Sequence, residues 1–162
     1  MPIDKSLFRQ VAGSFGSGVT VITTGLEGRY HGMTASAFCS LSLDPFQIIV
    51  CVDRAAHTLP LLQESGRFNV NILGAGQEAL SRIFASKDAP ERVTFDGIDF
   101  TLTQKGVPLL KGAIASFQCR VAQQFDGGDH IVIVGEVEDA AVGDGDEPLI
   151  YFRGGYRRLA AD

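Results

Sequence analysis

The chain has 162 residues, which is the length of one domain, so we expect a single domain over residues 1–162. Hydrophobic residues make up 45% of it and charged residues 20%, a composition that excludes a disordered chain, a coiled coil and a collagen. Fourteen Lys and Arg against 19 Asp and Glu give a net charge of 14 − 19 = −5. Because no basic run is present, the charge also argues against a nucleic-acid partner.

The cysteines and the N-terminus indicate where the protein works. Cys39, Cys51 and Cys119 form no C-x-x-C pair, and each lies in a stretch that we predict to be a buried strand. The N-terminus has no apolar signal region, and no apolar run is long enough to span a membrane. These features predict a reducing, cytoplasmic setting without a membrane partner.

The first predicted elements are a helix and a strand. Asp4 is a suitable N-cap, and the apolar residues of the following stretch fall on one helical face. These apolar residues are Leu7, Phe8, Val11 and Phe15. Residues 19–24 are rich in β-branched side chains and predict a strand, which ends at a turn over residues 27–29.

Residues 34–45 have the most unusual pattern in the chain. If this stretch is one extended strand, its side chains alternate between two faces. One face then carries Thr34, Ser36, Phe38, Ser40 and Ser42, and the other carries Ala35, Ala37, Cys39, Leu41 and Leu43. The row of hydroxyls could bind a polyhydroxylated or phosphorylated ligand. From the pattern alone, the simpler interpretation is that these hydroxyls satisfy turns.

The middle of the chain predicts short strands and helices in turn. Residues 48–52 are a continuous apolar run, typical of a strand that is covered on both faces. Thr58 is the expected N-cap of the next helix, and Gly66 its C-terminal glycine. Residues 68–73 predict a strand, and residues 77–84 predict a helix.

The last third of the chain predicts only strands and turns. Residues 98–102 and 113–124 predict strands, and the turn at 126–129 leads into a return strand over 130–138. Residues 148–152 predict the last strand. Seven or eight strands with two or three short helices, and no regular βαβ alternation, favour an antiparallel barrel with helices on its outside.

Most catalytic motifs are absent from the sequence. It contains no dinucleotide or phosphate glycine loop, no G-x-S-x-G elbow and no H-E-x-x-H, and its three histidines lie far apart. A hydrolase or a metalloenzyme is therefore poorly supported, and we expect no metal. Arg54, between a strand and a helix, could hold an anion together with Lys87 and Arg92. From the pattern alone, the simpler interpretation is that Arg54 is a plain surface charge.

Several motifs, in their order along the chain, resemble the short-chain flavin reductases of the FMN-binding split-barrel superfamily. They extend from Arg9 to Leu159. The motifs are GVTVITT at 18–24, GMTASAF at 32–38, SLS at 40–42, DP at 44–45, VDR at 52–54, SGRFNVNIL at 65–73, GDH at 128–130, IVGEV at 133–137 and PLIYFRGGYR at 148–157.

The resemblance implies a mainly β fold, the FMN-binding split barrel, which is a Greek-key antiparallel barrel with short flanking helices, and a homodimer. It also implies that NADH or NADPH reduces FMN or FAD, and that the reduced flavin goes to a partner monooxygenase. Because these cofactors carry the chemistry, no acid–base pair is needed. The alternatives on the same barrel are a tight FMN-binding storage or electron-transfer flavoprotein and a ferric reductase.

The resemblance assigns site residues as well. His130, in the GDH motif, would lie beside the nicotinamide as the catalytic residue. The flavin ring and ribityl chain would contact Met33, Thr34, Ala35, Ser36, Ser40 and Leu41, and the phosphate end would lie near Val52, Asp53, Arg54 and Thr58. Phe84, Ala85, Ser86 and Lys87 would also approach the flavin, and Tyr156 would flank the pocket. The choice between FMN and FAD stays open at this point.

Overall fold

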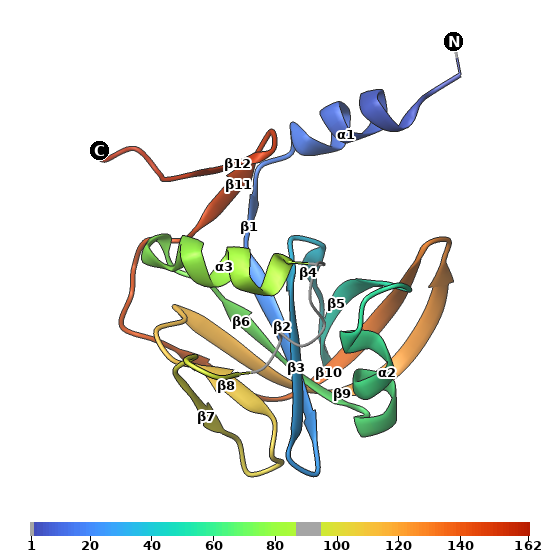
Figure 1. Ribbon diagram of the computed structural model, residues 1–162, viewed down its shortest axis with the longest axis vertical. Helices are drawn as coiled ribbons and strands as arrows, with labels where there is room; N and C mark the ends of the chain where they lie inside the picture. Colours follow the sequence, from blue (N-terminus) through green and yellow to red (C-terminus); the bar gives the residue numbers. More distant parts are fainter. Residues whose placement is uncertain (1, 87–94) are drawn as a thin grey trace.

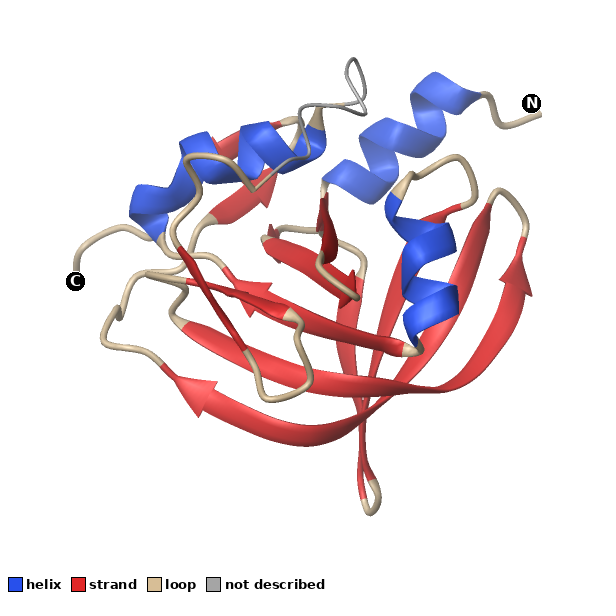
Figure 2. Cartoon of the chain, turned by 60° about the horizontal axis from the view of Figure 1, so that its bottom comes forward, coloured by secondary structure: helices blue, strands red, loops and turns tan. Residues whose placement is uncertain are grey.

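A computed structural model describes residues 2–86 and 95–162, and shows a curved antiparallel sheet with helices outside it (Figures 1 and 2). The sheet has seven strands in the order β3-β2-β6-β9-β10-β5-β4. The strands are β2 (Thr20–Leu26), β3 (Arg29–Ala35), β4 (Phe38–Leu43), β5 (Phe46–Asp53), β6 (Arg67–Ile72), β9 (Ala115–Gly127) and β10 (His130–Val142). The predicted mainly β architecture with flanking helices is confirmed.

Two smaller sheets and three helices complete the described elements. The small sheets are β1 (Ser17–Gly18) with β11 (Ile150–Phe152) and β12 (Gly155–Arg157), and β7 (Phe100–Leu102) with β8 (Pro108–Leu110). The helices are α1 (Lys5–Gly13), α2 (Thr58–Ser65) and α3 (Glu78–Ala85), the last preceded by the 3-10 turn η1 (Ala75–Gln77). Figure 1 shows α2 and α3 beside the barrel, and α1 beyond β1, away from it.

The apolar core has two parts. Inside the barrel, Phe68, Val50 and Ile133 are fully buried in one cluster. Gly135 lies against this cluster, and a Cβ at this position would come within 2.5 Å of the Phe68 ring. A second cluster lies beneath α3 and includes Phe84. The two clusters fix the barrel and its helical cover relative to each other.

Residues 34–45 do not form the single strand predicted above. β3 ends at Ala35 and β4 begins at Phe38, with Ser36 and Ala37 exposed between them. A register shift between Ser40 and Ser42 breaks the alternation again. The reason is topological, because β3 and β4 lie at opposite ends of the sheet order and the chain must bend to pass from one to the other.

Three other local predictions are corrected. The pattern of β5 alternates between buried and half-exposed residues, so the strand is not covered on both faces. Cys39 is exposed on β4, although Cys119 is buried and Cys51 partly buried. The N-cap of α2 is His57, and Thr58 is the first helical residue. The short strands β1, β8 and β12 were not predicted.

The predicted helix and strand ends are confirmed where local chemistry decides them. Asp4 caps α1, and its Oδ1 accepts a hydrogen bond of 2.8 Å from the backbone N–H of Leu7. Gly66 ends α2 in the left-handed conformation. The turn between β2 and β3 has positive φ at both Glu27 and Gly28, as the tightest hairpins require. Across residues 2–86 and 95–162, no helix is long and apolar enough to cross a membrane.

Candidate functional site

The candidate site is one rim of the barrel, at the junction of β3 and β4. The backbone N–H of Cys51 donates a hydrogen bond of 3.1 Å to the C=O of Ala37, so the junction lies against β5. Two residues further along β5, Asp53 pairs with His130 in the β5–β10 ladder. The exposed Ser36, the end of β5 and the start of β10 therefore share this rim.

His130 begins β10 directly after the β9–β10 turn, and its side chain is 41% exposed. Its Nδ1 lies 2.7 Å from Oδ1 of Asp129. The hydrogen bond and the charge of His130 lower the pKa of Asp129, so this carboxylate stays ionised and fixes the ring. Since Nδ1 is used in this way, Nε2 is the nitrogen that can meet a ligand.

Arg54 holds the β9–β10 turn, which precedes His130, in place. Its Nε donates a hydrogen bond of 2.7 Å to the C=O of Gly128, and its guanidinium forms an ion pair with Asp126. Its backbone N–H donates to the C=O of Asp129 at 3.0 Å. These contacts give Arg54 a positioning role for the turn that carries His130. The predicted contact of Arg54 with a phosphate stays a prediction.

Helix α2 is tied to β3 through a partly buried polar contact. Oγ1 of Thr58, which is fully buried, lies 2.6 Å from Nδ1 of His31 on β3. Burial lowers the pKa of His31, and the nearby His57 lowers it further. Oδ1 of Asp53 accepts a hydrogen bond of 2.8 Å from the backbone N–H of Ala55, which shapes the link from β5 to α2. The hydroxyl of Thr58 therefore holds two elements together inside the protein.

The lowered pKa of His31 predicts a loss of stability in mild acid. Below the ordinary pKa of 6.5, the unfolded chain takes up a proton on His31 that the folded chain resists. Protonation therefore stabilises the unfolded state, and stability present above 6.5 is lost as the pH falls toward the lower folded pKa. We expect the melting temperature to decrease more between pH 7.5 and 5.5 in the wild type than in His31→Gln.

Thermal melts at several pH values check this expectation. The matched control is His57→Gln, which keeps the half-buried imidazole of His31 and removes only the second cause of its lowered pKa. Its melting temperature should retain most of the pH dependence. Identical pH profiles for the wild type and His31→Gln would contradict the assignment.

Helix α3 is tied to β3 and to the C-terminal hairpin by a chain of hydroxyls. Oγ1 of Thr34 donates a hydrogen bond of 2.6 Å to the C=O of Ser81. The hydroxyl of Ser81, which is fully buried, lies 2.7 Å from that of Tyr156. The guanidinium of Arg82 lies 4.9 Å from the centre of the Tyr156 ring. Thr34 and Tyr156 thus fix α3 over the sheet.

The predicted site residues divide by exposure. Four are buried: Ala35, Val52, Thr58 and Phe84. Because their side chains pack inside the protein, only their backbone groups could contact a ligand. Five are partly exposed: Met33, Thr34, Asp53, His130 and Tyr156. Six are exposed: Ser36, Ser40, Leu41, Arg54, Ala85 and Ser86. Lys87 lies outside the described residues.

The structure does not place all of these residues together. Ser40 lines a separate groove between β4, β5, β9 and β10, away from the junction. Sequence reasoning, in turn, missed Asp129, His31 and Ser81. Asp129 stands next to His130 in the quoted motif, so its role had a visible signal. Ser81 had no such signal, because its partners come from β3 and β12.

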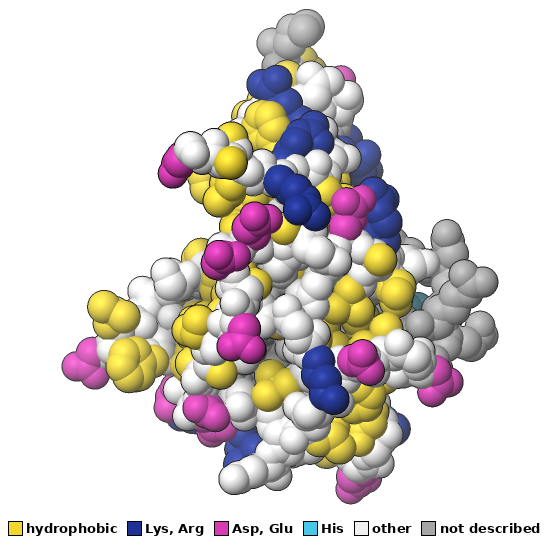
Figure 3. All heavy atoms as spheres, turned by 90° about the vertical axis from the view of Figure 1, so that its left-hand side faces the viewer, with side chains coloured by type: hydrophobic (Ala, Val, Ile, Leu, Met, Phe, Trp, Pro, Cys, Tyr) yellow, Lys and Arg dark blue, Asp and Glu magenta, His cyan; other side chains and the backbone are white. Residues whose placement is uncertain are grey.

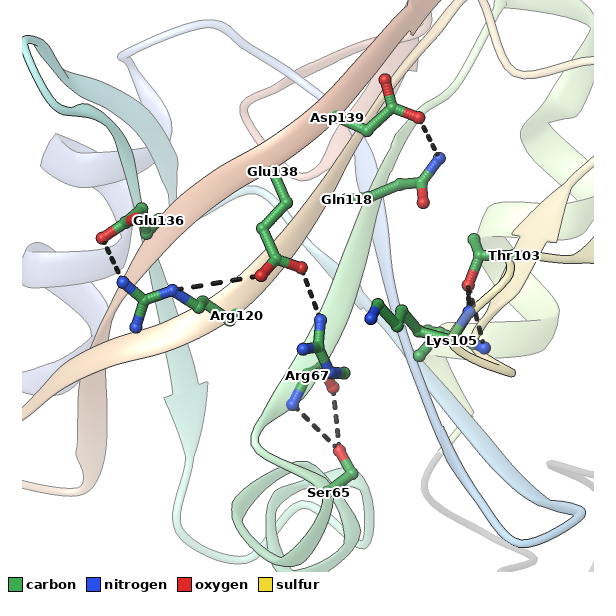
Figure 4. A network of polar contacts seen from close by, with 10 residues as sticks. Ser65, Arg67, Thr103, Lys105, Gln118, Arg120, Glu136, Glu138 and Asp139 are labelled. Atoms are coloured by element: carbon green, nitrogen blue, oxygen red, sulfur yellow. Dashed lines mark hydrogen bonds and ion pairs between the residues drawn. The ribbon is translucent and has the colours of Figure 1, made fainter.

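A second polar cluster lies on the sheet away from the rim, and Figure 4 shows its members. Arg67 forms an ion pair with Glu138, and Arg120 forms one of 2.7 Å with Glu136. Arg120 on β9 and Glu136 on β10 are opposite charges in directly paired positions, and the pair of Arg67 on β6 with Glu138 on β10 spans β9. Opposite charges placed in this way stabilise a sheet face. Within the described part of the chain, no group of three or more His, Cys, Asp or Glu could hold a metal.

Comparison with known proteins agrees with this geometry. Residues 12–160 match the model of the flavin reductase like domain. The reductase component of 4-hydroxyphenylacetate 3-monooxygenase from Thermus thermophilus is 39% identical, over 96% of this chain and 97% of its own. An NADH-dependent FAD reductase from Streptomyces globisporus is 38% identical, over 99% of this chain and 89% of its own.

Solved structures show the same likeness in three dimensions. Flavin reductase PheA2 superimposes with a TM-score of 0.89 at 40% identity, covering 98% of this chain and 100% of its own. The Streptomyces globisporus NADH:FAD oxidoreductase SgcE6, in complex with NAD and FAD fragments, gives 0.91 at 37% identity, covering 98% and 94%. The chain therefore belongs to the flavin reductase-like domain family and has its split-barrel fold.

Proposed function

We propose that this protein is an NADH-dependent flavin reductase that reduces FMN or FAD and supplies the reduced flavin to a partner monooxygenase. The observation that carries the proposal is the rim, where an oriented imidazole, that of His130, faces the end of β5 beside the exposed β3–β4 junction. Relatives of nearly equal length, named as an NADH-dependent FAD reductase and as a monooxygenase reductase component, support the substrates and the partner.

The rim fits a flat ring with a polar edge. Ser36 and Ala37 are small, exposed and part of neither strand, so the junction offers a hydroxyl and backbone groups without a bulky side chain in front of them. Behind the junction, the hydroxyl of Thr20 donates to the C=O of Ala35 at 2.6 Å and holds β3 in place. A rigid, open edge of this kind can bind a ring without first rearranging.

The role of the protein in the reaction is to bind and orient. Nicotinamide and flavin supply the hydride-transfer chemistry themselves. His130 contacts the nicotinamide through Nε2, and Asp129 holds the imidazole at Nδ1. Arg54 keeps the β9–β10 turn against the end of β5. Correct placement of two reacting rings is worth several orders of magnitude in rate, which explains why no acid–base pair is required.

The proposal includes a single domain over residues 1–162 and a homodimer. The family match over residues 12–160 supports the single domain. The exposed apolar face of α1 supports the homodimer, because α1 buries none of its residues in its own chain.

The test is aerobic NADH oxidation followed by absorbance, with and without added FMN or FAD. We expect fast turnover that rises with the concentration of added flavin, and slower turnover with NADPH. A yellow protein that keeps its flavin through gel filtration and does not oxidise NADH would instead indicate flavin storage. Ferric complex added without flavin is the control for ferric reduction, and we expect no turnover there.

A further inference from the structure

Helix α1 and the β11–β12 turn border a cavity of about 800 Å³, which we call the α1 cavity. Lys5 and Arg9 line it from the helix, and Arg153 lines it from the turn. The other lining residues are Ser6, Gln10, Ser14 and Gly154, so no Asp or Glu of the described residues lines the cavity. Its volume and its purely positive charge suit a small anionic molecule.

The three cations of the α1 cavity lack carboxylate partners, which sets them apart from most arginines of the chain. Across residues 2–86 and 95–162, six arginines form ion pairs: Arg29, Arg54, Arg67, Arg82, Arg120 and Arg158. Within the same ranges, Lys5, Arg9 and Arg153 form none. In a chain whose net charge is −5, these unpaired cations make one locally positive place that attracts an anion.

The backbone of the β11–β12 turn points to a role for the side chain of Arg153. Arg153 has a φ of 48°, in the left-handed region that favours glycine, asparagine or aspartate. Its guanidinium lies 5.1 Å from the centre of the Phe152 ring, a contact that holds the side chain without neutralising its charge. An arginine at a position where a smaller residue costs less indicates that the guanidinium has a function.

The walls of the α1 cavity are held together by the chain itself. The backbone N–H of Arg153 donates a hydrogen bond of 2.8 Å to the C=O of Gly13, at the end of the helix. Directly afterwards, Ser17 and Gly18 of β1 pair with β11. Figure 3 shows Lys and Arg side chains gathered toward the top of the molecule, the end at which α1 lies in Figure 1. A site that is already formed binds its ligand without the cost of ordering its parts.

The start of α1 lies within electrostatic range of the turn that carries His130. The pKa of Asp129 is lowered chiefly by its hydrogen bond with His130, and the charge of Lys5 adds to the effect. Figure 1 shows the start of α1 and the β9–β10 hairpin on the same side of the molecule. One extended molecule can therefore have a ring at the rim and an anionic group in the α1 cavity.

We propose that the α1 cavity binds the pyrophosphate and adenosine half of a dinucleotide substrate. The inference rests on the proposed function, in which NADH and FAD are substrates, and it assigns a place to the half that they share. Arg9 and Arg153 bind phosphate oxygens with paired N–H groups, and Lys5 adds a point charge. FMN lacks this half, so the cavity acts on dinucleotides alone.

Isothermal titration calorimetry with ADP tests the cavity directly. We expect the wild type to bind ADP, and Arg9→Gln and Arg153→Gln each to raise the Kd by about 10-fold or more, because each removes charge-assisted hydrogen bonds. Both side chains are exposed, so the changes leave the barrel folded, which circular dichroism verifies. Arg158→Gln is the matched control and should bind ADP like the wild type, since Arg158 pairs with Glu147 and lies outside the cavity lining.

Two smaller probes define what the cavity recognises. Adenosine lacks the phosphates and inorganic phosphate lacks the adenosine, so we expect each to bind about 10-fold or more weakly than ADP. An ADP Kd that is the same in the wild type and in both arginine variants would overturn the proposal. Inorganic phosphate that binds as tightly as ADP would also overturn it, because the site would then recognise only an anion.

Steady-state kinetics of Arg9→Gln/Arg153→Gln identify the dinucleotide. With FMN as the acceptor, a raised KM for NADH would assign the cavity to NADH. A raised KM for FAD, while the KM for NADH measured with FMN stays as in the wild type, would assign it to FAD. Unchanged values of both would refute the assignment to a substrate. Binding of ADP needs no turnover, so oxidation of NADH by the wild type with FMN shows separately whether the reductase function holds.

Discussion

Replacing His130 with alanine should reduce the rate of flavin reduction by about 100-fold, the usual cost of misplaced reactants, and leave flavin affinity nearly unchanged. The imidazole is held at Nδ1 by Asp129, so its free nitrogen is fixed in direction at the start of β10. Without the ring, the nicotinamide loses a positioning contact while the β3–β4 junction keeps its shape. Steady-state kinetics and a flavin titration monitored by fluorescence measure the two effects separately.

Two further variants define the role of His130. Asp129→Asn removes the charge that orients the ring but keeps a hydrogen-bonding side chain, and it should give an intermediate rate. His57→Ala, at an exposed histidine on the nearby link to α2, should leave the rate unchanged. If His130→Ala had the same kinetics as the wild type, the contact with the nicotinamide would be refuted.

Replacing Asn71 with leucine should cost about 3–5 kcal/mol of unfolding free energy, because buried polar groups would lose their partners. Asn71 on β6 is fully buried, and its Nδ2 donates hydrogen bonds to the C=O of Val21 at 2.9 Å and to Oγ1 of Thr23 at 3.1 Å. Its Oδ1 accepts a hydrogen bond of 2.9 Å from the backbone N–H of Leu110. This one amide therefore joins β2, β6 and β8, and leucine can replace none of the three bonds.

Differential scanning calorimetry should show the loss as a decrease of about 10 °C or more in melting temperature. The control is Gln118→Leu on the neighbouring strand β9. Among residues 2–86 and 95–162, the side-chain amide of Gln118 is bonded only to the exposed Asp139, at 3.0 Å, so we expect a change within about 0.5 kcal/mol. Equal losses of unfolding free energy in the two variants would show that the buried hydrogen bonds of Asn71 contribute no more to stability than the exposed hydrogen bond of Gln118.

Local chemistry was enough to predict many element ends in this chain. The cap at Asp4, the left-handed Gly66 and the turn before His130 each depend on residues within a few positions of one another. Long strands with strong β propensity, such as β2 and β10, were also predicted to within a few residues. The order of the strands in the sheet was not available from these signals, and the family resemblance supplied only the class of barrel.

Contacts that are distant in sequence account for the errors. The side chain of Thr58 is suited to an N-cap, but its hydroxyl is hydrogen-bonded to His31 on β3. The N-cap of α2 is therefore the preceding residue, His57. The hydroxyl of Thr34 was predicted to face a ligand, yet it donates to the C=O of Ser81, which is 47 positions away. The three-residue strands β8 and β12 are too short to give a periodic signal. His130 was found because its motif is local.

The pairing of β1 with β11 affects how the chain can fold during its synthesis. Ser17 pairs with Tyr151 and Gly18 with Ile150, so β1 cannot form this pairing until residues 150–151 have been made. Closing so long a loop is slow and has a large entropic cost, which places this step late in folding. A ribosome-bound chain would therefore hold the amphipathic segment before β1 unanchored until residues 150–153 emerge, and this is the interval in which chaperones would have their main effect.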